Sequence, residues 1–126
     1  TFKPGKATHM VLATHMTPVC DCFGFTSLPI LPDSGIYGSD DIVALDQAVL
    51  DGIGRKPLIE ENVPTSMEVW QRNGHPLAWL HGPLKDPYKV TEYLEALGRG
   101  TRQDELVDVM PVERIERAPL GYIAAK

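Results

Sequence analysis

The stretch SDDIVALDQAVLDGIG, residues 39–54, carries the clearest secondary-structure signal in the chain. Its apolar side chains recur at helical spacing, which predicts an amphipathic helix with one face on a core. Ser39 is a suitable N-cap, the acidic pair after it complements the positive end of a helix dipole, and Gly54 is a natural stop. The apolar residues are Ile42, Leu45, Ala48, Val49 and Ile53.

Three further elements are expected around this helix. Residues 7–16, ATHMVLATHM, predict a strand because a short apolar run lies between threonines. A second helix is expected from Pro87 to Leu97, with Asp86 as its cap. Within residues 104–112, Leu106, Asp108 and Met110 alternate with Val107 and Val109, which predicts a second strand. The apolar side expected for the second helix consists of Val90, Tyr93, Leu94 and Leu97.

A long connection, residues 17–38, separates the first strand from the main helix. It is rich in proline and glycine, which favour turns, but it also holds many aromatic and aliphatic residues. Loops of this length in a compact domain are usually functional or disordered, and the apolar content argues against disorder. We therefore expect a functional loop over residues 17–38. The order of elements predicts an α/β fold, a small mixed sheet flanked by helices, with residues 1–126 as a single domain.

Composition narrows the classes of protein. The chain has 126 residues, of which 43% are hydrophobic and 23% charged, as in ordinary globular domains. A net charge of −5 with scattered basic residues argues against nucleic acid as a partner. There is no run of about 18 apolar residues that would span a membrane. Two cysteines make no disulfide framework and the first ten residues lack the apolar run of a secretion signal, so we expect a cytoplasmic protein.

The two cysteines lie in HMTPVCDCFGF, residues 15–25, with one aspartate between them. A disulfide between positions i and i+2 would close a small, strained ring. On an extended segment Cys20 and Cys22 point to the same face, whereas Asp21 points away. Paired thiolates suit zinc, copper(I) or an iron–sulfur cluster, but a cluster usually needs four cysteines. Other ligands would then come from histidines, from another chain or from sequence outside these residues. The alternative is that both thiols are simply buried.

Several other residues are candidate metal ligands. His15 precedes the cysteines, and Asp33 follows a proline at a turn, where it either binds a cation or forms an Asx-type turn. Asp46 lies in the main helix, either on the solvent face or buried and paired. The histidines of NGHPLAWLHGP are six residues apart, which is no recognised zinc spacing. The possible additional ligands are Asp21, Asp41, Asp46, His75 and His81.

Three stretches together resemble a known family: TPVCDCFGF, LPDSGIYGSDDIVALDQAVLD and EYLEALGRGTRQDELVDV. They are similar to the closing part of the iron–sulfur-centre proteins grouped as domain-of-unknown-function family three hundred sixty-two, over residues 8–54 and 88–110. The resemblance implies cluster binding and electron handling. It places Cys20 and Cys22 at the paired-cysteine positions and Asp33, Asp41 and Asp46 at acidic positions of that pattern.

The chain departs from this family in one respect, because it has no C-x-x-C-x-x-C run. The resemblance therefore implies that the ferredoxin-like part lies upstream, lies on another subunit or has been lost. In the first case residues 1–126 are the C-terminal part of a larger iron–sulfur-centre protein.

Three functions follow as expectations. The first is an iron–sulfur-associated redox or electron-transfer subunit whose C-x-C loop supplies ligands, with another subunit or a redox partner. The second is a non-catalytic accessory subunit with buried, unligated cysteines. The third is a mononuclear metal enzyme that uses both cysteines and one histidine, with water at an open position.

Overall fold

The computed structural model describes residues 6–67, 74–82 and 84–109. Its sheet has two antiparallel strands, β1 (His9–Ala13) and β2 (Gly35–Ser39), with Val11 opposite Tyr37. The predicted first strand is therefore confirmed. The second strand begins at Gly35, inside the loop expected at residues 17–38, so the last part of the expected loop belongs to the sheet.

Three α-helices accompany this sheet: α1 (Ile42–Gly54), α2 (Pro76–His81) and α3 (Lys89–Ala96). Two single-turn 3₁₀-helices lie at Asp21–Phe23 and Glu60–Asn62. The predicted main helix and the predicted helix near residue 90 are both confirmed, and α2 was not predicted. A small α/β fold with one small sheet and helices is thus borne out by the structure.

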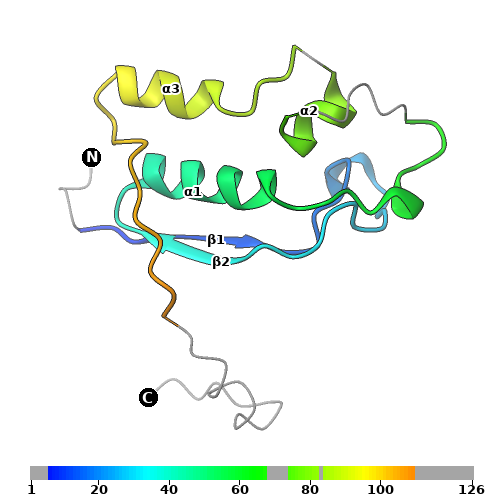
Figure 1. Ribbon diagram of the computed structural model, residues 1–126, viewed down its shortest axis with the longest axis horizontal. Coiled ribbons are helices and arrows are strands. Elements are labelled where there is room, and N and C mark those ends of the chain that lie inside the picture. Colours follow the sequence, from blue (N-terminus) through cyan, green and yellow to red (C-terminus); the bar gives the residue numbers. More distant parts are fainter. Residues whose placement is uncertain (1–5, 68–73, 83, 110–126) are drawn as a thin grey trace, which may run out of the picture.

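The elements form layers (Figure 1). Helix α1 lies across one face of the sheet, and α3 lies on the side of α1 that faces away from the sheet. Because α1 is covered on two sides, its buried residues extend around much of the helix rather than along one stripe. This position makes α1 the centre of the fold.

The apolar core lies between α1, the sheet and the loop before β2. Its buried members are Ala13, Ile30, Leu31, Leu45, Val49 and Ile53. A side chain at Gly52 would collide with the hydroxyl of Tyr37 and lie 2.9 Å from Ser34 Oγ. Glycine at this position therefore lets α1 approach β2 closely, and the Tyr37 hydroxyl stays hydrogen-bonded to Ser34 Oγ at 2.7 Å.

The N-cap of α1 is Asp41, whereas the sequence predicted Ser39. Asp41 Oδ1 accepts hydrogen bonds from the backbone N–H groups of Val43 at 2.8 Å and Ala44 at 3.2 Å. Ser39 is the last residue of β2, and its hydroxyl accepts a hydrogen bond from the Asp41 N–H at 3.0 Å. A strand, which the sequence did not predict here, occupies Ser39, so the N-cap lies two residues later than expected.

Helix α3 turns most of its predicted apolar side to solvent, and of that side only Leu94 is half-buried. Val90, Tyr93 and Leu97 are exposed, whereas Thr91 is only 1% exposed. The reason is the surface that α1 offers: Gln47 of α1 faces α3 and bonds the Thr91 hydroxyl at 3.0 Å. A polar contact therefore joins the two helices, and the apolar stripe of α3 faces outward.

The strand predicted at 104–112 is wrong for residues 104–109, which belong to no strand; residues 110–112 lie outside the described part. The chain just before this segment is held by hydrogen bonds to side chains and not by the hydrogen bonds of a β-sheet. The N–H of Thr101 donates to Asp41 Oδ2 at 2.9 Å, and that of Arg102 donates to Glu95 Oε1 at 2.8 Å. Alternation alone, without a neighbouring strand edge, does not make a strand.

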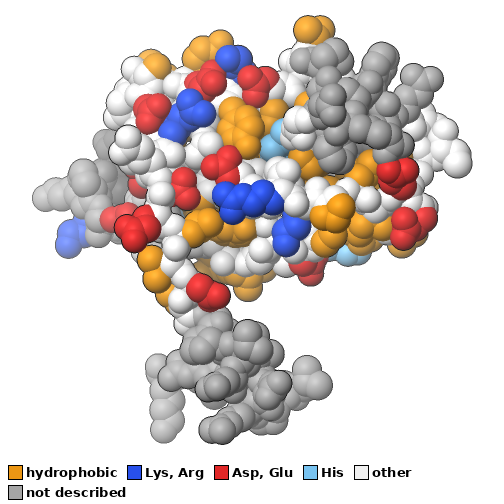
Figure 2. Space-filling view, viewed as in Figure 1, with side chains coloured by type: hydrophobic (Ala, Val, Ile, Leu, Met, Phe, Trp, Pro, Cys, Tyr) orange, Lys and Arg blue, Asp and Glu red, His pale blue; other side chains and the backbone are white. Residues whose placement is uncertain are grey.

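The surface agrees with the scattered charge of the sequence. On the face drawn in Figure 2, lysine and arginine side chains alternate with aspartate and glutamate and gather in no single patch. Over the residues that the structure describes, none of the helices is long and apolar enough to cross a membrane.

Candidate functional site

The sequence suggested an extended segment at the two cysteines, but they lie on a tight turn. The turn closes where the N–H of Phe23 donates to the Cys20 carbonyl at 3.2 Å, and residues 21–23 form a single 3₁₀ turn. Glycine follows at position 24 with φ +84°, a conformation that glycine adopts without strain. This local geometry brings the two thiols to one point of the surface.

Cys20 and Cys22 contact each other within the turn. The N–H of Cys22 donates to Cys20 Sγ at 3.4 Å. The pKa of the Cys22 thiol is raised, chiefly because its side chain is hydrogen-bonded to Cys20 and secondly because of partial desolvation. Both side chains are exposed. The expectation of two adjacent soft donors is therefore met by a different backbone conformation, and the alternative of buried thiols is wrong.

Large apolar side chains surround this turn. Phe23 is 71% exposed and Phe25 56% exposed, and Leu28 is also largely exposed. From residue 14 to residue 32, the sequence contains one carboxylate, Asp21, and no lysine or arginine. Exposed aromatic groups with few charges are typical of the centre of a protein–protein interface.

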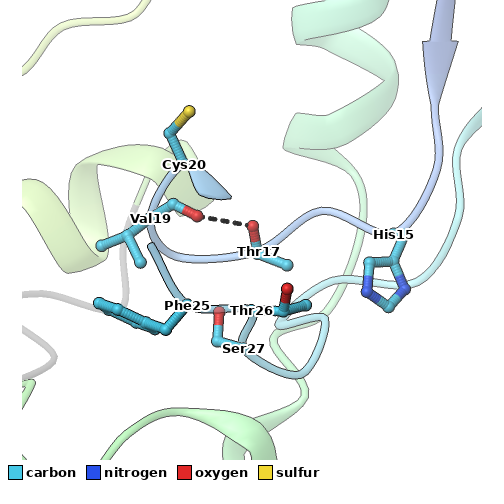
Figure 3. Close-up of a pocket in the computed structure, with 7 residues that line it drawn as sticks. All are labelled: His15, Thr17, Val19, Cys20, Phe25, Thr26 and Ser27. Carbon is cyan, nitrogen blue, oxygen red and sulfur yellow. Dashed lines mark hydrogen bonds between the residues drawn. The ribbon is translucent and has the colours of Figure 1, made fainter. Parts of the chain in front are cut away.

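A hollow of about 320 Å³ opens beside the turn, lined by His15, Thr17, Val19, Cys20, Phe25, Thr26 and Ser27. Figure 3 shows the His15 ring at the far end from Cys20, and the Cys20 sulfur directed away from the three hydroxyl groups. The Thr17 hydroxyl donates to the Val19 carbonyl at 2.8 Å. Ser27 Oγ is buried and has no hydrogen-bond partner among the described residues.

The candidate ligands His15 and Asp33 lie close together, but the Asp33 carboxylate contacts the backbone of His15 and not its ring. Asp33 Oδ1 accepts a hydrogen bond from the His15 N–H at 2.8 Å. His15 has φ +50°, which is uncommon for a residue other than glycine. The carboxylate therefore fixes the bend at the end of β1, and the imidazole remains exposed.

The other acidic candidates are dispersed. Asp41 caps α1 and also holds the Thr101 N–H, so both of its oxygens are engaged. Burial raises the pKa of the Asp41 carboxyl, but the N–H groups of Thr101, Ala44 and Val43 outweigh it, and the pKa is lowered overall. Asp46 lies half-buried on α1. Asp21 lies in the turn itself, and its side chain is outside the described part.

His75 is a buried structural residue. Its Nδ1 accepts the Leu77 N–H at 3.2 Å as the N-cap of α2, and its Nε2 lies 2.9 Å from the Leu50 carbonyl. Because Nδ1 is an acceptor, Nε2 carries the proton and donates to Leu50. Both ring nitrogens are thus used by the fold. His81 ends α2, and its side chain is outside the described part.

No group of three or more histidine, cysteine, aspartate or glutamate side chains in the described ranges is arranged to hold a metal ion. The cysteine pair therefore offers two thiol ligands on one turn. Two thiolates fit one edge of a metal or iron–sulfur centre, and they do not fit a whole centre, which takes four protein ligands in structural zinc and cluster sites.

A second polar site, which the sequence analysis missed, lies between α1 and α3. The Tyr88 hydroxyl donates to Asp51 Oδ1 at 2.9 Å, and the Tyr88 ring packs edge-on against His75 with ring centroids 5.5 Å apart. These three residues and Arg55 line an open hollow of about 380 Å³. The sequence signal that could have indicated this site is the spacing of Gln47 and Asp51, which lie one turn apart on α1.

Tyr88→Phe is expected to lower the free energy of unfolding by about 1 kcal/mol at pH 8, because the bond to Asp51 is lost. Burial first, and then the hydrogen bond and charge of Asp51, raise the pKa of Tyr88 to about 12. An unfolded tyrosine titrates near about pH 10. The stabilisation is therefore complete below pH 10 and is lost as the pH rises toward 12.

Chemical denaturation at pH 8 and pH 11 checks this dependence, since the difference between wild type and Tyr88→Phe should shrink at the higher pH. Tyr93→Phe is the matched control, because Tyr93 lies on the exposed side of the same helix. A difference that stays constant with pH would contradict the assigned hydrogen bond.

Comparison with models of protein families, with curated proteins and with solved structures gave no match.

Proposed function

We propose that this protein is an iron–sulfur-associated redox or electron-transfer subunit in which Cys20 and Cys22 supply two ligands to a shared metal or iron–sulfur centre. The remaining ligands belong to another polypeptide or to sequence outside the described residues. The resemblance of residues 8–54 and 88–110 to an iron–sulfur family agrees with this proposal. The proposed subunit would be cytoplasmic, where thiols stay reduced.

One observation carries the proposal: two exposed cysteines lie on a single turn, and Cys20 Sγ already accepts a backbone N–H at 3.4 Å. Hydrogen bonds to sulfur stabilise thiolates and help set the potential of iron–sulfur clusters. When bound, the centre would supply one-electron chemistry. The chain's own part is to hold two thiolates at a fixed separation and to shield them with the neighbouring Phe23 side chain.

The two other functions are less well supported. A mononuclear metal enzyme needs a third protein ligand near the thiols, and His15 lies at the far end of the adjacent hollow (Figure 3). An accessory subunit with inert thiols needs buried cysteines, whereas both are exposed.

Cys20→Ser and Cys22→Ser are each expected to lose most of the bound iron, sulfide or zinc with unchanged helix content, because each removes one of two chelating thiolates. The measurement is metal and acid-labile sulfide content, with a visible spectrum, on protein purified anaerobically with whatever accompanies it. The matched control is His15→Asn, since asparagine tolerates the positive φ at this position and the imidazole is not proposed as a ligand. We expect this control to keep its metal.

Two results would overturn the proposal. One is wild-type protein that contains no metal, takes up none on reconstitution with iron and sulfide or with zinc, and keeps two titratable thiols. Such a result would favour the accessory subunit. The other is full metal content in either serine variant.

A further inference from the structure

The ligand count of the chain points to a particular partner. The whole sequence contains two cysteines, and both lie on the turn described above. Structural zinc sites take four protein ligands, and a [2Fe–2S] cluster is commonly held by four thiolates. Two copies of the same turn supply that number without any other protein.

We propose that a second copy of this chain completes the site, so that Cys20 and Cys22 of each copy bind one four-thiolate centre on a twofold axis. This inference rests on the proposed function and names its partner. Twofold homodimers are the most common protein assemblies, and their interface uses the same patch on both copies. A ligand pair at the surface is well placed for such an axis, because the symmetry doubles two donors to four.

The surroundings of the thiols fit self-association. Phe23 lies on the same turn and Phe25 lines the hollow beside Cys20; both are exposed and would be buried against the second copy. The chain has a net charge of −5, so two copies repel each other over most of their surface. Residues 14–32 carry one carboxylate and no lysine or arginine, so this segment presents little repulsion. The outer face of the sheet is a second apolar surface, but it carries no pair of cysteine ligands.

The chemistry with zinc is simple to balance. One Zn²⁺ ion binds four thiols, forms four Zn–S bonds and releases four protons to the buffer, with no change of oxidation state. Because each thiol loses a proton when it binds zinc, metal binding should strengthen as the pH rises.

Zinc titration of the reduced full chain tests the inference, with mass measured by light scattering. We expect one zinc ion bound per two chains and a change from 13.9 kDa to twice that mass. Cobalt in place of zinc should show the absorption of tetrahedral thiolate coordination at the same ratio. Cys20→Ser and Cys22→Ser should remain monomeric at all zinc concentrations used.

Phe23→Ala keeps both thiols and tests the apolar part of the interface. We expect it to weaken dimer formation by about tenfold or more, as aromatic residues at interface centres do. Leu84→Ala is the matched control, because Leu84 is 97% exposed and lies far along the chain. It should dimerise as the wild type does.

The possible outcomes separate this inference from the proposed function. One zinc ion per chain in a monomer, or metal bound only with a different polypeptide, overturns the second copy and leaves the proposed function standing. No binding of zinc, cobalt or reconstituted iron and sulfide overturns both. A zinc-dependent dimer that persists in either serine variant also overturns the inference, because other residues would then hold the ion.

Discussion

Asp41→Ala is expected to lower the free energy of unfolding by about 2–3 kcal/mol, since it removes an N-cap and a long-range hydrogen bond together. The carboxylate holds the first turn of α1 through Val43 and Ala44, and it holds the returning chain through Thr101. The lowered pKa of Asp41 means that this stabilisation is present above the pKa of the unfolded carboxyl, about pH 4, and is lost as the pH falls. Urea denaturation at pH 7 and pH 3 measures both effects.

Two variants control this result. Asp40→Ala removes the neighbouring carboxylate, which is exposed, and should change the stability by less than about 0.5 kcal/mol. Asp41→Asn keeps an oxygen acceptor but no charge, so its effect should lie between the two. Equal stability of Asp41→Ala and Asp40→Ala would show that the cap contributes nothing.

His75→Ala is expected to cost about 3 kcal/mol, because it opens a cavity and leaves two backbone groups without their partner. The ring is 9% exposed, bonds the Leu50 carbonyl and the Leu77 N–H, and packs against Tyr88. It therefore joins the end of α1 to the start of α2. Thermal and urea denaturation measure the loss.

His75→Asn is the matched comparison, because asparagine is a good N-cap and can still accept the Leu77 N–H. It should recover about 1 kcal/mol of the stability that alanine loses. If His75→Ala unfolds at the same denaturant concentration as wild type, then the contacts assigned to this ring do not stabilise the fold.

Two of the three α-helices in the described residues, α1 and α3, were predicted from the sequence, and α1 shows why. Its stripe of Leu45, Val49 and Ile53 has the helical period, and the glycine-rich end marks where it stops. The first strand was found for a similar reason, since a short apolar run between polar residues needs only local information. Boundaries were less certain, and the N-cap moved from Ser39 to Asp41 because β2 continues up to the helix.

The sequence-based predictions were wrong where contacts with another part of the chain determine the local structure. The apolar stripe of α3 predicts a buried face, but α1 presents Gln47 and Asp51 to it, so Thr91 is buried instead. Residues 104–109 alternate as a strand does, yet within the described part of the chain they pair with no strand. The cysteine pair was predicted to be two adjacent donors, and the turn that makes them adjacent depends on the closing bond from Phe23 to Cys20.

The polar contact between α1 and α3 also divides the stability of the molecule. None of the described core residues comes from α3, because that cluster belongs to α1, the sheet and the adjoining loops. The bonds that hold α3 are made by Tyr88, Thr91 and Arg102 to side chains of α1. Helix α3 can therefore open while the core stays closed, and its amide protons would exchange with solvent through local unfolding well before those of α1.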